Sequence, residues 1–211
     1  QACAETVKDN YSKAIELLEK PVVRPWSSSM ARRVLEFILP RSPSNGKRIR
    51  ELMARSYRTE KQFDDVSAVL EPVLEEPGIM ELLEGMVEEN PGETSLVRSL
   101  TRTAGLRGDF ERFHRYSAVL LELAPDSAED VVSMASSMAS RNDSGQAYIY
   151  AARTASRYRV EADMDELVTK AVLLMPELAK EGLLQEFHRM GPLPRALCGL
   201  ASGDDEAFTR V

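Results

Sequence analysis

Short amphipathic segments separated by prolines and polar turns succeed one another along this chain, and this pattern constrains the fold more than any other feature. The clearest example runs from Gly108 to Pro125, where a Gly-Asp turn precedes a helix-forming segment. Residues at steps of three and four share one face of that segment: Phe113, Tyr116, Ser117, Leu120 and Leu121. Pro125 predicts the end of the helix, because proline lacks the N–H group that the helical ladder needs.

The same pattern predicts an all-α fold of about 11 to 12 antiparallel helices, since no stretch alternates apolar and polar residues as a half-buried strand does. The helices are expected at residues 2–20, 30–39, 47–58, 63–74, 79–87, 95–106, 108–125, 131–139, 146–158, 164–175, 181–190 and 193–201. Pro72 lies inside one of them and predicts a kink or an early end there. Asp126 and Ser127 can cap the helix that follows them.

Composition narrows the possible classes of protein. The chain has 211 residues, 43% of them hydrophobic, which is enough for one large domain or an extended repeat array. Its net charge of −7 speaks against nucleic acid as the main partner. No apolar run approaches the roughly 20 residues of a membrane span, and Cys3 and Cys198 form no disulfide framework or metal motif.

Two helical repeats fit the sequence. Pro77, Pro125 and Pro176 lie 48 and 51 residues apart, which indicates a repeat of three helices. A repeat of two helices fits steps of 32 to 34 residues, with pairs beginning near Ser44, Gly78, Phe110, Ser144 and Leu178. The chain begins at Gln1, and residues 203–208 start a further copy, so we expect a fragment of a longer array or an abbreviated last helix.

The turn and stop residues resemble those of the tetratricopeptide-repeat family. Gly108, Asp109, Phe110 and Pro125 stand where the family has its turn and the end of its second helix, although Phe113 takes a place usually given to alanine. The resemblance implies a single domain over residues 1–211, built as an αα-superhelix with irregular repeats. Such helices stack because one hairpin cannot bury its apolar stripe alone.

The resemblance also implies partner-binding residues on the helices that face the concave groove. Carried over from the prolines, these are Lys47, Arg50, Arg98, Arg102 and Arg153. Arg98 and Arg102 are one turn apart and share a helix face. A basic groove suits an acidic peptide or a C-terminal carboxylate. The alternative to a basic groove is an ordinary solvated face whose charges pair with nearby acids. In a stack in which successive helices simply alternate, Arg98 and Arg153 would also lie on opposite faces of the array.

These features predict a scaffold or adaptor that binds a partner peptide or helix as part of a larger assembly. The alternatives are a helical-repeat RNA-binding module and the non-catalytic domain of a larger enzyme. His114 and His188 lack metal-ligand spacing, and no phosphate-binding loop occurs, so we expect no catalytic centre, metal or cofactor. Met134 and Met138 are expected in the core rather than in a binding groove.

Overall fold

The computed structural model of the chain describes residues 10–19, 28–181 and 191–202, which contain eleven α-helices and no strand. The α-helices are α2 (Tyr11–Glu19), α3 (Ser28–Ile38), α4 (Gly46–Thr59), α5 (Phe63–Leu70), α6 (Ile79–Glu89), α7 (Thr94–Arg107), α8 (Phe110–Leu123), α9 (Ala128–Asn142), α10 (Gly145–Tyr158), α11 (Met164–Leu174) and α13 (Pro192–Ser202). The all-α prediction is confirmed for this part of the chain. The helix predicted at 181–190 and the first part of the one at 2–20 lie outside the described residues, as do Cys3 and His188.

Helix α8 forms as its sequence predicts. Gly108 has a φ of +71°, a conformation that costs glycine little. The Asp109 carboxylate accepts a hydrogen bond from the backbone N–H of Arg112 at 3.1 Å and so caps the helix. The buried face consists of the five residues that the spacing predicts. After Leu123 the chain leaves the helix, and Pro125 begins a short 3-10 turn, η4 (Pro125–Ser127).

Two further local expectations have different outcomes. Helix α5 ends at Leu70, and Pro72 lies in the 3-10 turn η3 (Glu71–Val73), so the early end is confirmed. Asp126 and Ser127 belong to η4, and Ser127, although it precedes α9, makes no capping hydrogen bond with its side chain. Ser127 thus occupies the N-cap position of α9 but does not cap it, because its backbone, with φ of −77° and ψ of 2°, lies outside the extended region that capping residues adopt.

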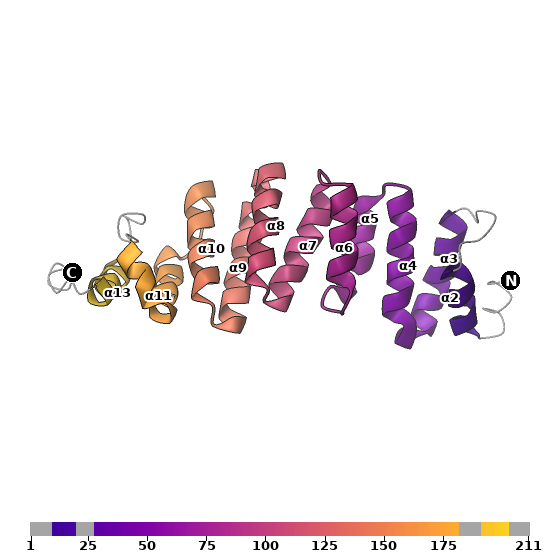
Figure 1. The fold of residues 1–211 in the computed structure, drawn as a ribbon, viewed down its shortest axis with the longest axis horizontal. Coiled ribbons are helices and arrows are strands. Elements are labelled where there is room, and N and C mark those ends of the chain that lie inside the picture. The colour runs from indigo at the N-terminus through magenta and orange to yellow at the C-terminus, as the bar shows by residue number, and fades with distance from the viewer. Residues whose placement is uncertain (1–9, 20–27, 182–190, 203–211) are drawn as a thin grey trace. The chain divides into compact units, whose positions relative to one another are not determined.

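The chain divides into two compact units, Gln1–Thr103 and Ala104–Val211. Consecutive helices pack in antiparallel fashion within each of them, as the ribbon in Figure 1 shows. In unit 1, α3 packs against α2 and α4, and α4 against α5; in unit 2, α10 packs between α9 and α11, and α11 against α13. The predicted core position of Met138 is confirmed, whereas Met134 is only half-buried.

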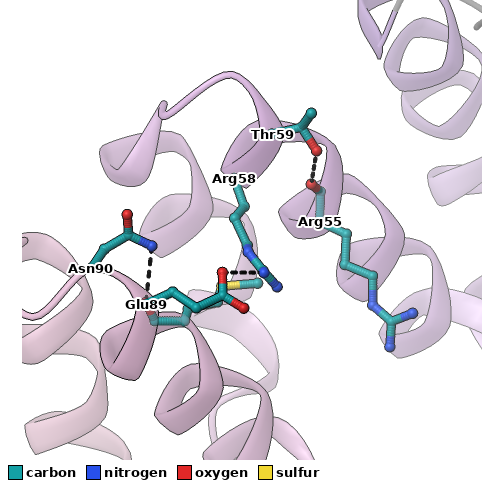
Figure 2. Close-up of polar contacts among 6 residues, drawn as sticks. Arg55, Arg58, Thr59, Glu89 and Asn90 are labelled. Atoms are coloured by element: carbon teal, nitrogen blue, oxygen red, sulfur yellow. Dashed lines mark hydrogen bonds and ion pairs between the residues drawn. The ribbon is translucent and has the colours of Figure 1, made fainter.

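Alternate helices, which are two apart along the chain, are also joined by polar contacts. In unit 1, Ser67 of α5 donates a hydrogen bond to the backbone carbonyl of Ser95 on α7 at 3.0 Å. Figure 2 shows Arg58 of α4 paired with Glu89 at the end of α6, while the Arg55 guanidinium lies apart from that pair. The helices α4, α6, α8 and α10 begin at steps of 33, 31 and 35 residues. The helix starts thus follow the two-helix spacing.

One contact between alternate helices predicts a pH-dependent contribution to stability. The guanidinium of Arg48 on α4 makes two hydrogen bonds to the Glu19 carboxylate at the end of α2, and these bonds lower the pKa of Glu19. A carboxyl group with a lowered folded-state pKa stabilises the fold above its unfolded pKa and loses that effect as the pH falls through the folded pKa. Both side chains are about one-third exposed or more.

We therefore expect Arg48→Gln to lower the free energy of unfolding by no more than about 1 kcal/mol at neutral pH. The difference from the wild type should shrink as the pH falls to about 3, where carboxylates become protonated. Urea unfolding of both proteins across this range measures it, with Arg33→Gln on α3 as a control for loss of charge. A difference that stays constant with pH would contradict the assignment.

Candidate functional site

The predicted partner-binding residues of α4 are engaged within unit 1. The Lys47 ammonium donates to the backbone carbonyl of Pro77 and lies 3.6 Å from the Glu51 carboxylate. The Arg50 guanidinium donates to the backbone carbonyl of Val69, in the last turn of α5, at 3.1 Å. A cation that bonds the final carbonyls of a helix stabilises its C-terminus. Lys47 thus joins α4 to the chain between α5 and α6, and Arg50 joins α4 to the end of α5.

The predicted pair on α7 is more exposed. Arg98 and Arg102 lie one turn apart on α7, as expected, and both side chains are exposed. The Arg102 guanidinium bonds the Glu71 carboxylate of η3 at 2.6 Å. Four of the predicted residues thus belong to unit 1, and Arg153 belongs to unit 2. Neither unit by itself therefore contains a groove lined by all five predicted partner-binding residues.

Arg153 instead lines a cavity of about 600 Å³ within unit 2. Its walls are one face of α8, one face of α10 and the chain that follows α11. The lining residues are Phe110, His114, Ala118, Leu121, Glu122, Gln146, Ile149, Tyr150, Arg153, Thr154, Arg157, Tyr158, Met175 and Leu178. The cavity therefore combines aromatic, apolar and charged side chains from segments far apart in the sequence.

Aromatic rings gather at one end of this cavity. The Tyr150 ring lies 4.9 Å from the His114 ring and 6.1 Å from the Phe110 ring, measured between ring centres, and both pairs are steeply inclined. Such edge-to-face arrangements are favoured by the quadrupoles of aromatic rings. The Tyr150 hydroxyl also lies 2.8 Å from the Ser117 hydroxyl, within hydrogen-bonding distance. The Tyr150 ring is thus held in place by α8.

Beneath this cluster lies Phe113, which is fully buried. Its ring meets the Tyr150 ring edge to face at 5.9 Å. A Cβ atom on Gly105 of α7 would lie only 3.3 Å from the Phe113 ring. The large residue on α8 is therefore accommodated by a residue without a side chain on α7. This explains how unit 2 tolerates phenylalanine where the resemblance leads one to expect alanine.

The charged residues occupy the other end of the cavity. Helices α8 and α10 run in the same direction, because each is antiparallel to α9 between them. On α8, Phe110 and His114 precede Glu122. On α10, Tyr150 precedes Arg153 and Arg157, and a second aromatic residue, Tyr158, follows the arginines. The exposed Arg157 guanidinium lies 5.5 Å from the centre of the Tyr158 ring. The cavity thus has an aromatic half, formed by Phe110, His114 and Tyr150, and a charged half, in which Tyr158 lies beside Arg157.

Of the residues that line this cavity, the sequence predicted only Arg153 as a partner-binding residue. His114, which lacks metal-ligand spacing in the sequence, is exposed, yet its ring belongs to the aromatic cluster. Phe110 and His114 are four residues apart on α8, and Ser117 and Tyr150 are 33 apart. A search for polar and aromatic residues about 33 residues apart, the length of one two-helix repeat, would have predicted that Ser117 and Tyr150 lie side by side.

The described residues offer few other candidates for chemistry. No group of three or more His, Cys, Asp or Glu side chains in this part of the chain is arranged to hold a metal ion. Burial raises the pKa of the Cys198 thiol on α13, which favours its protonated form. No helix in the described ranges is both long and apolar enough to cross a membrane.

These features define the class of the molecule, an all-α protein in which successive antiparallel helices pack on one another. No protein-family model matches the sequence, and comparison with curated proteins finds no significant match. The resemblance to tetratricopeptide repeats therefore rests on the turn residues, the helix pairs and the two-helix spacing alone.

Proposed function

We propose that this chain is a protein-interaction module, a scaffold or adaptor that receives a segment of a partner protein. Its helices form a tetratricopeptide-like solenoid, and the partner segment enters the cavity between α8 and α10. The two-helix spacing of the helix starts and the contacts between alternate helices support the solenoid.

The observation that carries the proposal is the cavity itself. Its volume of about 600 Å³ falls within the 300–1,000 Å³ usual for ligand pockets. Tyrosine and arginine are the residue types enriched where protein interfaces gain most of their binding energy, and both line this cavity. The chain has only 6% aromatic residues, so their concentration at one opening is a specific feature.

Filling the cavity should abolish binding. Ala118 of α8 is exposed and lines the cavity, so Ala118→Phe would place a ring in the space that the partner occupies. Peptides selected from a random display library on the wild-type chain should bind this variant at least tenfold more weakly in fluorescence polarisation. Ser156→Phe, at an exposed position of α10 outside the cavity lining, adds the same ring and should change the affinity less than twofold.

Two results would overturn the proposal. One is a library selection that yields no peptide with affinity for the wild-type chain. The other is a set of peptides whose affinity is the same for Ala118→Phe and for the wild type, because their binding would then not use the cavity. Circular dichroism of the variant establishes that it has kept its helices.

A further inference from the structure

We infer that the cavity of unit 2 selects an extended acidic segment of a partner protein, with a bulky apolar side chain in the aromatic half and carboxylates in the charged half. This inference rests on the proposed function and specifies its ligand. It follows from the order of the lining residues along α8 and α10.

The aromatic half suits one bulky apolar side chain. Phe110, His114 and Tyr150 form its aromatic wall, with ring-centre distances of 4.9 to 6.1 Å. Ile149 and Leu178 supply aliphatic surface at the same cavity, and both are almost fully buried. A phenylalanine or leucine side chain that enters this half would remove apolar surface from water on both sides.

The charged half suits carboxylates. Arg153 and Arg157 are four residues apart on α10, so their side chains emerge one turn apart on the same face. Arginine binds carboxylates through two parallel hydrogen bonds, which fixes the orientation of the bound group. No acidic residue occurs in α10, from Gly145 to Tyr158. Helix α10 therefore contributes arginines but no carboxylate to the cavity.

Glu122 of α8 lies across the cavity and limits the charge that it accepts. Apart from His114, the ionisable lining residues that carry charge are two arginines and one glutamate, a net charge of +1. A phosphate concentrates about two negative charges on one group. Two guanidinium groups one turn apart can instead each bind a separate, singly charged carboxylate. The separation of the two guanidinium groups therefore favours two aspartate or glutamate side chains over a single phosphorylated residue.

The helix geometry predicts the spacing of the two elements in the peptide. Arg153 and Arg157 follow Tyr150 by three and seven residues, which is about 4 and about 10 Å along the helix axis. An extended peptide advances by about 3.3–3.6 Å per residue. The carboxylates should therefore lie one to three residues from the apolar anchor.

The cavity volume favours an extended segment over a helix. A helix is 10–12 Å across with 5.4 Å per turn, so one turn alone takes up about 500 Å³. A cavity of about 600 Å³ would hold little more than that turn. A single turn cannot reach from the aromatic half to Arg157.

Synthetic peptides test this inference directly. The probe is a short fluorescein-labelled peptide with an amidated C-terminus, one phenylalanine and glutamates one and three residues from it, in a Gly/Ser background, so that both glutamates lie on one side of the extended chain. The orders Phe-before-Glu and Glu-before-Phe are both made. We expect one order to bind the wild-type chain at least tenfold more tightly than the peptides with glutamine for glutamate or alanine for phenylalanine. Equal affinity for the glutamate and glutamine peptides would overturn the inference.

Substitutions in the protein test whether Arg153 and Arg157 bind the carboxylates of the peptide. Arg153→Gln together with Arg157→Gln should weaken binding of the glutamate peptide at least tenfold and leave the glutamine peptide within about twofold. The matched control is Arg112→Gln with Arg115→Gln on α8, which removes the same charge at two exposed positions outside the cavity lining. If the control weakens binding equally, net charge rather than the cavity attracts the peptide, and the inference fails.

The same measurements separate this inference from the proposed function. Library peptides that lose affinity with Ala118→Phe but carry no acidic residues would overturn the acidic specificity and leave the cavity as a protein-binding site. A single-stranded uridine oligonucleotide serves as the competing probe. If it binds more tightly than every peptide and depends on Arg153 and Arg157, both the inference and the proposed function fail in favour of RNA binding.

Discussion

Replacing Phe113 with alanine should lower the free energy of unfolding by about 3–5 kcal/mol, the usual cost of removing a large aromatic side chain from a packed core. Phe113 is among the largest side chains that are fully buried, and it contacts α10 through the Tyr150 ring. Its loss leaves a void between α7, α8 and α10, because Gly105 has no side chain that could fill it. Urea unfolding followed by circular dichroism measures the effect.

The control is Leu123→Ala on the same helix. Leu123 is 41% exposed, so its truncation should cost less than about 1 kcal/mol. A further variant tests the pairing with glycine: Gly105→Ala should be unfavourable beside Phe113, because the new Cβ would lie 3.3 Å from the ring. It should stabilise the Phe113→Ala protein, where helix propensity favours alanine over glycine by about 1 kcal/mol. A Phe113→Ala protein as stable as the wild type would contradict the packing of unit 2.

The helices and their buried faces were predictable from the sequence because both depend on local spacing. Phe113, Leu120 and Leu121 share a face of α8 by helix geometry alone, whatever packs against them. The effect of Pro72 was equally local, since a proline in a helix interior removes a hydrogen bond wherever the helix lies. Ser127 does not cap α9 because the 3-10 turn before that helix gives Ser127 a backbone conformation other than the extended one that capping requires.

The candidate site was not predictable in the same way. It depends on which residues of α8 lie opposite which residues of α10, and these are more than 30 positions apart. The resemblance selected Arg153, which lines the cavity, together with Lys47 and Arg50, whose contacts bind backbone carbonyls of unit 1. An arginine that the resemblance assigns to the groove can thus line a cavity, as Arg153 does, or bond the end of a helix, as Arg50 does. Only the packing of its neighbours distinguishes the two roles.

Replacing Ala151 with leucine should destabilise the fold by about 1–3 kcal/mol, since inserting methylene groups into a packed interior forces side chains or backbone to move. Ala147, Ala151 and Ala155 follow one another at steps of four on α10 and are essentially inaccessible to solvent. Helix α10 packs between α9 and α11, so small side chains at these positions allow its neighbours to approach closely. Thermal unfolding followed by circular dichroism measures the change.

Helix propensity cannot produce this loss, because leucine and alanine are both strong helix formers. Ser156→Leu is the control, at an exposed position of the same helix, and it should change the free energy of unfolding by no more than about 0.5 kcal/mol. If Ala151→Leu proved as stable as Ser156→Leu, α10 would have free space on its alanine face. The position of Tyr150 and Arg153 in the cavity would then no longer be fixed by close packing, and the spacing predicted for the acidic peptide would lose its basis.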